Sequence, residues 1–154
     1  MSTERQYCTF LVDVFYFGIP VEQVQEILRY QEMTPVPLAP REVEGLINLR
    51  GEIVTAVDLR RRLEIGDRPE GMLPTNVVTL TADGAMSFLA DEIGDVVEVD
   101  ESTSEPPPPT LKGVARHLIS RVYKLDSRLL LVLDVERTAD LEVVSSRRET
   151  RAAA

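Results

Sequence analysis

The sequence predicts a mainly β protein with a few short helices. Apolar runs rich in Val, Leu and Ile recur at short intervals, and Gly, Pro, Asp or Ser residues separate them. The 154 residues include 10 prolines and 8 glycines, no tryptophan, and only 5% aromatic residues. The core must therefore be built chiefly from aliphatic side chains, which suits strands joined by tight turns.

Nine apolar runs have the composition and length of strands. In chain order the predicted strands are Tyr7 to Asp13, Phe15 to Ile19, Leu46 to Leu49, Glu52 to Val57, Asn76 to Ala82, Met86 to Ala90, Asp95 to Val99, Ile119 to Leu125 and Leu129 to Asp134. The last run lacks polar alternation at residues 129 to 133, so we expect that strand to be covered on both faces.

Two turns connect predicted strands into hairpins. Asp83-Gly84 tolerates the positive φ angles of a tight hairpin turn. Asp126-Ser127 separates the last two strands and predicts a second hairpin.

Helical patterns are short. After Pro20, apolar residues at Val21, Val24 and Leu28 fall on one helical face and predict a helix from Val21 to Leu28. Asp58 is a suitable N-cap for a helix over Leu59 to Leu63, which Gly66 would end. A final short helix is expected from Val135 to about Val143. No internal repeat is evident.

Two further segments are predicted to be loops: Glu64 to Pro74, and Ser102 to Thr110 with four consecutive prolines at 106 to 109. The prolines favour an extended conformation without backbone donors. We interpret them as a stiff surface connector, with a recognition ligand for an aromatic groove as the alternative.

Composition excludes several classes of partner. Acids outnumber Lys and Arg by 26 to 17, and the net charge of −9 disfavours nucleic acid and anionic membranes. One cysteine, Cys8, and one histidine, His117, provide neither a disulfide nor a zinc cage. No apolar run approaches the ~18 residues that span a bilayer. We therefore expect a cytoplasmic protein without direct membrane insertion, cofactor or metal.

Residue patterns for catalysis are scarce, and we predict no catalytic residue. Cys8 lies in a strand pattern, where a buried inert thiol is expected. The triple arginine at 60 to 62 is predicted to be a solvated face that offsets nearby acids, with contact to an anion as the alternative. Acids at predicted turns are expected to be solvated, namely Asp83, Asp91, Asp95 and Asp126. An enzyme that uses a pair of such carboxylates remains an alternative.

One segment carries a specific motif. Gly45 and two apolar residues precede Asn48-Leu49-Arg50-Gly51, and the next apolar strand ends in Asp58-Leu59-Arg60. This order resembles the CheW-domain family, the coupling proteins of bacterial and archaeal chemotaxis. Further matches occur in order from Gln6 to Asp140, and they are Phe17-Gly18-Ile19-Pro20, Val24-Gln25-Glu26-Ile27, Thr34-Pro35-Val36-Pro37, Val96-Val97-Glu98-Val99 and Leu129 to Glu136.

The resemblance implies a fold and a function. The fold would be two packed five-stranded SH3-like β-barrels in one CheW-like domain over residues 6 to 142, with flexible termini at 1 to 5 and 145 to 154. The protein would be a non-catalytic adaptor in chemotaxis signal transduction. It would link the cytoplasmic tip of methyl-accepting chemoreceptors to the regulatory domain of the histidine kinase CheA, and it would be recruited to membrane-associated receptor arrays.

The resemblance also implies interface residues, which are Val24, Glu26, Ile27, Gly45, Asn48, Arg50 and Gly51. Five of them have a structural alternative. Glu26 and Arg50 could form an ion pair that fixes the predicted short helix onto the Arg50 turn. Val24 and Ile27 could belong to the core, and the Asn48 side chain is expected to stabilise a turn by bonding to the backbone instead of contacting a partner.

Some segments depart from the family pattern. The first hairpin turn is Asp13-Val14-Phe15-Tyr16, where family members usually have glycine and polar residues. Arg121 and Tyr123 stand where small residues are expected, and the proline run is long. These departures favour, as an alternative, an adaptor of a paralogous chemosensory system that controls surface motility or development. A small-molecule-binding β-barrel sensor is a third alternative, and it would require a closed apolar pocket.

Overall fold

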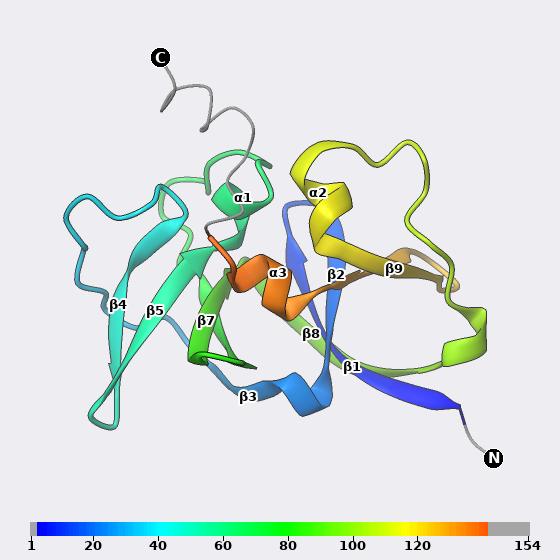
Figure 1. The fold of residues 1–154 in the computed structure, drawn as a ribbon, viewed down its shortest axis with the longest axis horizontal. Helices are drawn as coiled ribbons and strands as arrows, with labels where there is room; N and C mark the ends of the chain where they lie inside the picture. Colours follow the sequence, from blue (N-terminus) through cyan, green and yellow to red (C-terminus); the bar gives the residue numbers. More distant parts are fainter. Residues whose placement is uncertain (1–2, 142–154) are drawn as a thin grey trace.

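The computed structural model describes residues 3–141, and it contains two five-stranded sheets with a few short helices (Figure 1). The strands are β1 (Glu4–Val12), β2 (Phe15–Pro20), β3 (Val24–Leu28), β4 (Val43–Leu49), β5 (Glu52–Asp58), β6 (Thr75–Thr81), β7 (Gly84–Ala90), β8 (Glu92–Asp100), β9 (Ile119–Lys124) and β10 (Leu129–Leu133). The helices are α1 (Leu59–Arg62), α2 (Gly113–Leu118) and α3 (Val135–Ala139), with 3₁₀ turns η1 (Val21–Gln23) and η2 (Glu101–Thr103). The predicted fold class is confirmed.

The strands of one sheet are inserted in the sequence between strands of the other. Strands β3 to β7 are consecutive in sequence and form what we call the inserted sheet, in the order β3-β6-β7-β5-β4. The terminal sheet, β8-β1-β2-β10-β9, takes strands from both ends of the described chain. The two sheets lie next to each other, with the inserted sheet on the left of Figure 1. The chain crosses between them at η1 and again between β7 and β8.

The two sheets share one topology. Each contains two antiparallel hairpins joined by a parallel pair, which is β5 with β7 in the inserted sheet and β10 with β2 in the terminal sheet. In each, the chain after one edge strand also bridges the other edge strand. Thr34 and Leu46 exchange two backbone hydrogen bonds of 2.9 and 2.8 Å, and Glu105 and Val122 exchange two of 2.9 Å. These bridges join the open edges of each sheet, as in a barrel.

The core is continuous between the sheets. Its largest cluster combines Phe10 and Phe17 of the terminal sheet with Val57 and Phe88 of the inserted sheet, all at most 2% exposed. Each sheet also has a smaller cluster of its own. Leu131 of β10 joins the shared cluster, whereas its neighbour Leu130 joins the smaller cluster of the terminal sheet. Strand β10 is therefore covered on both faces, as the sequence predicted.

The predicted helix over Val21 to Leu28 is wrong. Only η1 is helical, and the rest is β3, which pairs with β6 through contacts such as Ile27 with Val77. Burial along β3 alternates, since Val24, Glu26 and Leu28 are partly buried while their neighbours are exposed. A window of eight residues fits a helical and an alternating pattern equally well, and the hydrogen-bonding edge of β6 decides between them.

Several predicted boundaries shift. The Asp83-Gly84 hairpin is confirmed, but its turn residues are Ala82 and Asp83, and Gly84 begins β7 at φ 118°. The hairpin at Asp126-Ser127 is confirmed. Strand β1 begins at Glu4, inside the segment expected to be flexible. Helix α3 ends at Ala139, and the predictions for 142 to 154 lie outside the described residues.

Helix α1 begins as predicted, because the Asp58 carboxylate accepts a 2.9 Å hydrogen bond from Arg60 N. Its end differs. Glu64, with φ 57°, takes the left-handed position expected of Gly66. The backbone N–H groups of Glu64 and Ile65 donate to Arg61 O at 3.2 Å and to Arg60 O at 2.9 Å, which is a Schellman motif.

The prediction that the triple arginine is solvated is wrong for two of its members. Arg60 and Arg62 are only 6% and 4% exposed. Arg62 donates to the backbone oxygens of Arg137, Thr138 and Asp140 at 2.9 to 3.0 Å. It thereby ties α1 of the inserted sheet to α3, which follows the terminal sheet.

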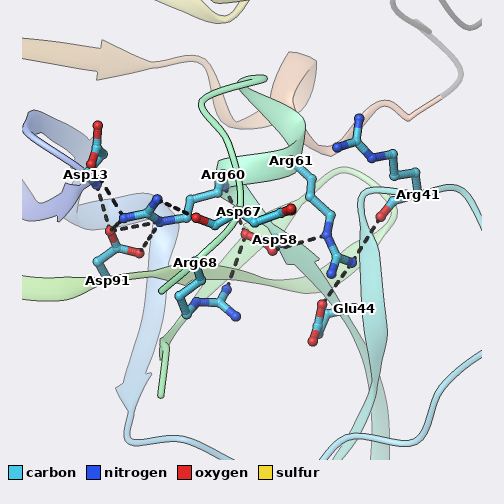
Figure 2. A network of polar contacts seen from close by, with 9 residues as sticks. All are labelled: Asp13, Arg41, Glu44, Asp58, Arg60, Arg61, Asp67, Arg68 and Asp91. Atoms are coloured by element: carbon cyan, nitrogen blue, oxygen red, sulfur yellow. Dashed lines mark hydrogen bonds and ion pairs between the residues drawn. The ribbon is translucent and has the colours of Figure 1, made fainter. Parts of the chain in front are cut away.

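Arg60 makes a second and stronger connection (Figure 2). Its Nε lies 3.0 and 3.1 Å from the two carboxylate oxygens of Asp91, and its Nη2 lies 2.6 Å from Oδ2. Asp13, in the β1–β2 turn, lies 3.7 Å from the same Nη2 and donates its backbone N–H to Asp91 at 2.7 Å. Arg60 also donates to Asp67 O at 3.0 Å. Asp91 is therefore not the solvated turn acid that the sequence predicted.

The position of Asp91 gives this pair its importance. It is the residue between β7 and β8, where the chain passes from the inserted to the terminal sheet. Its backbone N–H also donates to Leu11 O of β1 at 2.9 Å. The Arg60–Asp91 pair therefore fixes the crossing point between the sheets, with both side chains less than a tenth exposed.

Replacing Arg60 by methionine should lower the free energy of unfolding by about 3 kcal/mol, because it leaves the buried Asp91 carboxylate without its partner. Urea denaturation measures the change. Arg137→Met is the control, since Arg137 is 55% exposed and its ion pair with Asp134 spans 3.9 Å. A surface pair of this kind contributes less than about 1 kcal/mol. Equal losses in the two variants would contradict a special role for Arg60.

The same pair predicts a pH dependence. Burial raises the pKa of the Asp91 carboxyl, but hydrogen bonds from Arg60 and from the Asp13 backbone lower it more, so the pKa lies below its ordinary value. The stability that ionised Asp91 contributes is therefore present above the unfolded-state pKa, near 4, and is lost as pH falls through the lower folded-state pKa. The difference in unfolding free energy between the native protein and Asp91→Asn should stay constant above about pH 5 and shrink below about pH 4. A difference that grows on acidification would contradict this assignment.

Candidate functional site

The predicted interface residues come from three strands of the inserted sheet. Val24, Glu26 and Ile27 lie on β3, Gly45 and Asn48 on β4, and Arg50-Gly51 forms the turn to β5. Strands β3 and β4 are the two edges of this sheet. The site therefore lies where the sheet closes on itself.

The Arg50 turn has the geometry of a tight hairpin. Leu49 pairs with Glu52, so Arg50 and Gly51 are the two loop residues, with φ angles of 52° and 87°. Two successive positive φ angles are those of a type I′ turn, which matches the twist of the flanking strands. Asn48 Oδ1 accepts a 2.9 Å hydrogen bond from Gly51 N, which confirms that Asn48 stabilises the turn.

Arg50 and Glu26 form the expected ion pair. Arg50 Nη2 lies 2.5 Å from Glu26 Oε1, and this hydrogen bond is the main cause that raises the pKa of the Arg50 guanidinium. Because Glu26 lies on β3, the pair joins the two edges of the sheet and not a helix to a turn. The Arg50 side chain is nevertheless 66% exposed, so most of its guanidinium faces solvent. Exposed pairs add little stability, and the group remains accessible to another protein.

The apolar candidates separate into two environments. Val24 is partly buried and packs against the shared core, which supports its structural interpretation. Ile27 is 41% exposed on the edge strand. Ile53 was not among the predicted residues, although it is 61% exposed and pairs across the hairpin with Asn48. Neighbouring side chains of a strand point to opposite faces, so Ile53 and the buried Val54 could not both enter the core.

Gly45 has a packing role. A Cβ atom built on it would lie 2.8 Å from Thr34 O and 3.0 Å from Met33 Cβ. The missing side chain lets the chain after β3 approach β4 closely enough for the Thr34–Leu46 bridge. Gly45 thus supports the closure of the sheet from a buried position.

Reactive groups are few among the described residues. Cys8 is buried in β1, as predicted, and burial raises the pKa of its thiol. Residues 3–141 contain no group of three or more His, Cys, Asp or Glu side chains placed to hold a metal ion. Over the same range, no helix is long and apolar enough to cross a membrane.

A family model described as the CheW-like domain matches residues 6–143. This chain belongs to the CheW-like domain family. The family assignment made from the Asn48-Leu49-Arg50-Gly51 motif and its neighbours is therefore confirmed.

Relatives within the CheW-like family match most of the chain. It is 31% identical over 139 residues to the chemotaxis protein CheW of Treponema pallidum, covering 86% of this chain and 80% of that protein. The chemotaxis protein CheW of Bacillus subtilis is 29% identical, covering 92% and 91%. The crystal structure of the scaffolding protein TtCheW from Thermoanaerobacter tengcongensis superposes with a TM-score of 0.80 at 24% identity, covering 88% of this chain and 92% of that one. This chain therefore has the fold and family of CheW-type chemotaxis scaffolds.

Gly45→Ala should destabilise the protein by about 1 to 3 kcal/mol, because the added methyl group must displace the backbone of Thr34. Chemical denaturation measures the loss. Glu52→Ala changes an exposed side chain in the same hairpin and should leave the unfolding midpoint nearly unchanged. A Gly45→Ala variant as stable as Glu52→Ala would show that the close approach of Thr34 is not required.

Proposed function

We propose that this protein is a non-catalytic adaptor that couples methyl-accepting chemoreceptors to the histidine kinase CheA. The exposed Arg50 guanidinium is the observation that carries the proposal. A rigid two-residue turn and one ion pair to Glu26 hold it in place, while exposed Ile27 and Ile53 lie on the same sheet. A charged group held on the same sheet as exposed apolar side chains is typical of a protein interface.

Two partners follow from this proposal. The first is the regulatory domain of the kinase. In chemotaxis systems that use proteins of this family, that kinase domain shares the fold of the adaptor. The second is the helical cytoplasmic tip of a receptor, which requires an apolar surface with charges at its rim. Exposed Ile27 supplies an apolar contact, and Glu26 and Arg50 supply the charges. The adaptor would act in the cytoplasm and be recruited to membrane-associated receptor arrays.

A second candidate keeps the adaptor role but changes the pathway. The first hairpin exposes Val14 by 80% and Phe15 by 42%, in a turn where polar residues are usual. An apolar turn of this kind favours an additional or altered contact. It supports an adaptor of a paralogous chemosensory system, such as one that controls surface motility or development.

Arg50→Ala should fold normally but lose receptor-dependent stimulation of the kinase by at least tenfold, because the variant lacks the exposed guanidinium. The measurement is kinase autophosphorylation in a reconstituted mixture with receptor and CheA, alongside the unfolding midpoint. Arg29→Ala is the matched control, since Arg29 is an exposed arginine that follows β3 directly.

Glu26→Gln separates the two roles of the ion pair. The variant weakens the pair but leaves the guanidinium in place, so it should retain more stimulation than Arg50→Ala. Full stimulation by Arg50→Ala would refute the role of Arg50 in coupling. Equal losses in both variants would mean that only the ion pair between β3 and the turn is needed.

A further inference from the structure

A cavity of about 290 Å³ lies between the terminal sheet and the start of α3. Its charged and polar lining includes Arg5 and Tyr7 of β1, Gln23 of η1, Arg121 of β9, and Asp134 and Glu136 at the start of α3. The volume is close to the lower end of ligand pockets, which hold about 300 to 1,000 Å³, so the cavity suits a small molecule. We call it the α3 cavity.

Two guanidinium groups converge at this cavity, although β1 and β9 are not neighbours in the terminal sheet. Arg5 Nη1 and Arg121 Nη1 lie 3.3 and 3.4 Å from the same oxygen, Glu101 Oε1. Glu22 also contacts Arg5, at 3.2 Å. Neither acid lines the α3 cavity. A guanidinium group has several N–H donors, so donors remain for a molecule inside the cavity.

A buried hydroxyl pair adds a further donor. The hydroxyl oxygens of Tyr7 and Tyr123 lie 3.2 Å apart, and both residues are only 1% exposed. Their shared hydrogen bond uses one of the two O–H protons, and the other has no acceptor within residues 3–141. Burial is the main cause that raises the pKa of the Tyr7 hydroxyl, so this group stays protonated. A carboxylate held by the two arginines can accept the remaining proton.

The helix side of the cavity is acidic. Both carboxylate oxygens of Glu136 accept from Ala82 N, at 3.2 and 3.0 Å, and within residues 3–141 this carboxylate forms no ion pair with a basic side chain. Asp134 differs, because its Oδ2 lies 3.9 Å from Arg137 Nε. The negative charge of Glu136 therefore lacks a cationic partner in the described part of the chain.

Charges of both signs line the cavity, and this limits the class of ligand. A free anion would be repelled by the carboxylates of Asp134 and Glu136. A free cation would be repelled by the two arginines. A zwitterion avoids both penalties, because it can place its negative group at the arginines and its positive group at Glu136.

Two of these residues also depart from the family pattern. Arg121 and Tyr123 stand where small residues are expected. Small residues at both positions would remove one guanidinium and the hydroxyl pair. The carboxylate-binding side of the α3 cavity is therefore built by residues that distinguish this chain from the family pattern.

We propose that the α3 cavity binds a small zwitterion, an amino acid with one carboxylate and one ammonium group. The carboxylate lies between Arg5 and Arg121 and accepts a hydrogen bond from the tyrosine pair, and the ammonium group donates to Glu136. The inference goes beyond the adaptor function and does not depend on it, because the Arg50 turn belongs to the inserted sheet.

Isothermal titration calorimetry with the full chain tests the proposal. The probes are glycine, β-alanine and γ-aminobutyrate, which separate the same two charges by increasing lengths. Butyrate and butylamine are the controls, because each carries only one of the charges. We expect the best of the three zwitterions to bind at least tenfold more tightly than either control. Equal affinity for butyrate or for butylamine, or no heat of binding from any zwitterion at millimolar concentration, would overturn the proposal.

Variants test whether the zwitterion occupies this cavity. Arg121→Gln and Glu136→Gln should each weaken binding of the best zwitterion at least fivefold. Glu136→Gln should not weaken butyrate binding, because it removes a repelling carboxylate. Lys124→Gln is the matched control, since Lys124 is 74% exposed on the same strand as Arg121 and does not line the cavity. Losses no larger than that of Lys124→Gln would place the zwitterion elsewhere and overturn the proposal.

The unfolding midpoint of each variant shows whether it folds. Glu136 is exposed, and glutamine keeps an acceptor for Ala82 N, so Glu136→Gln tests the cavity even if Arg121→Gln is unstable. Amide chemical shifts of the native protein give an independent location. Saturation with the best zwitterion should move the signals of Tyr7 and Ser120 and leave that of Ile53 in place. Movement of Ile53 without Tyr7 and Ser120 would contradict the assignment.

Discussion

The pairing of Arg60 with Asp91 is the interaction on which the arrangement of the two sheets depends. Burying two charges costs free energy that is recovered only when the geometry is close to ideal. Here the guanidinium contacts both carboxylate oxygens, and its remaining donors reach Asp67 O and Asp13. Because Asp91 is the residue at which the chain passes between the sheets, the pair sets how the inserted sheet meets the terminal sheet. The continuous core around Phe10 and Phe88 packs between the two sheets, whose relative position this pair fixes.

A fixed arrangement of the two sheets suits the proposed role as an adaptor. The two sheets share one topology and close their edges in the same way, through the Thr34–Leu46 and Glu105–Val122 bridges. Each sheet therefore presents a firm surface, and Arg62 ties α1 to the backbone around α3. The spacing of these surfaces is determined by buried contacts and not by a flexible linker. Membership of the CheW-like family and the fold of a scaffolding relative agree with this organisation.

Local patterns in the sequence predicted most strands and the two hairpins at Asp83-Gly84 and Asp126-Ser127, because alternation and turn residues act over short distances. Strand β3 was mistaken for a helix, since only its pairing with β6 settles the ambiguity of an eight-residue window. The burial of Arg60 and Arg62 was missed, because their partners, Asp91 and the backbone around Thr138, lie far along the chain. The topology that the two sheets share was not evident as a sequence repeat, because the strand order along the chain differs between them. The β6–β7 hairpin comes last in the inserted sheet, but it corresponds to β1–β2, which comes first in the terminal sheet. Of the candidate site, the Glu26–Arg50 pair came from the family resemblance, while the role of Gly45 required the position of Thr34.

In the proposed function, one molecule of this protein holds a kinase domain and a receptor tip at the same time. Sedimentation of the purified protein with the CheA regulatory domain and a soluble receptor tip fragment tests it most directly. We expect a single complex that contains all three components and that does not form when this protein is omitted. Two separate binary complexes, in which each partner excludes the other, would refute the adaptor role.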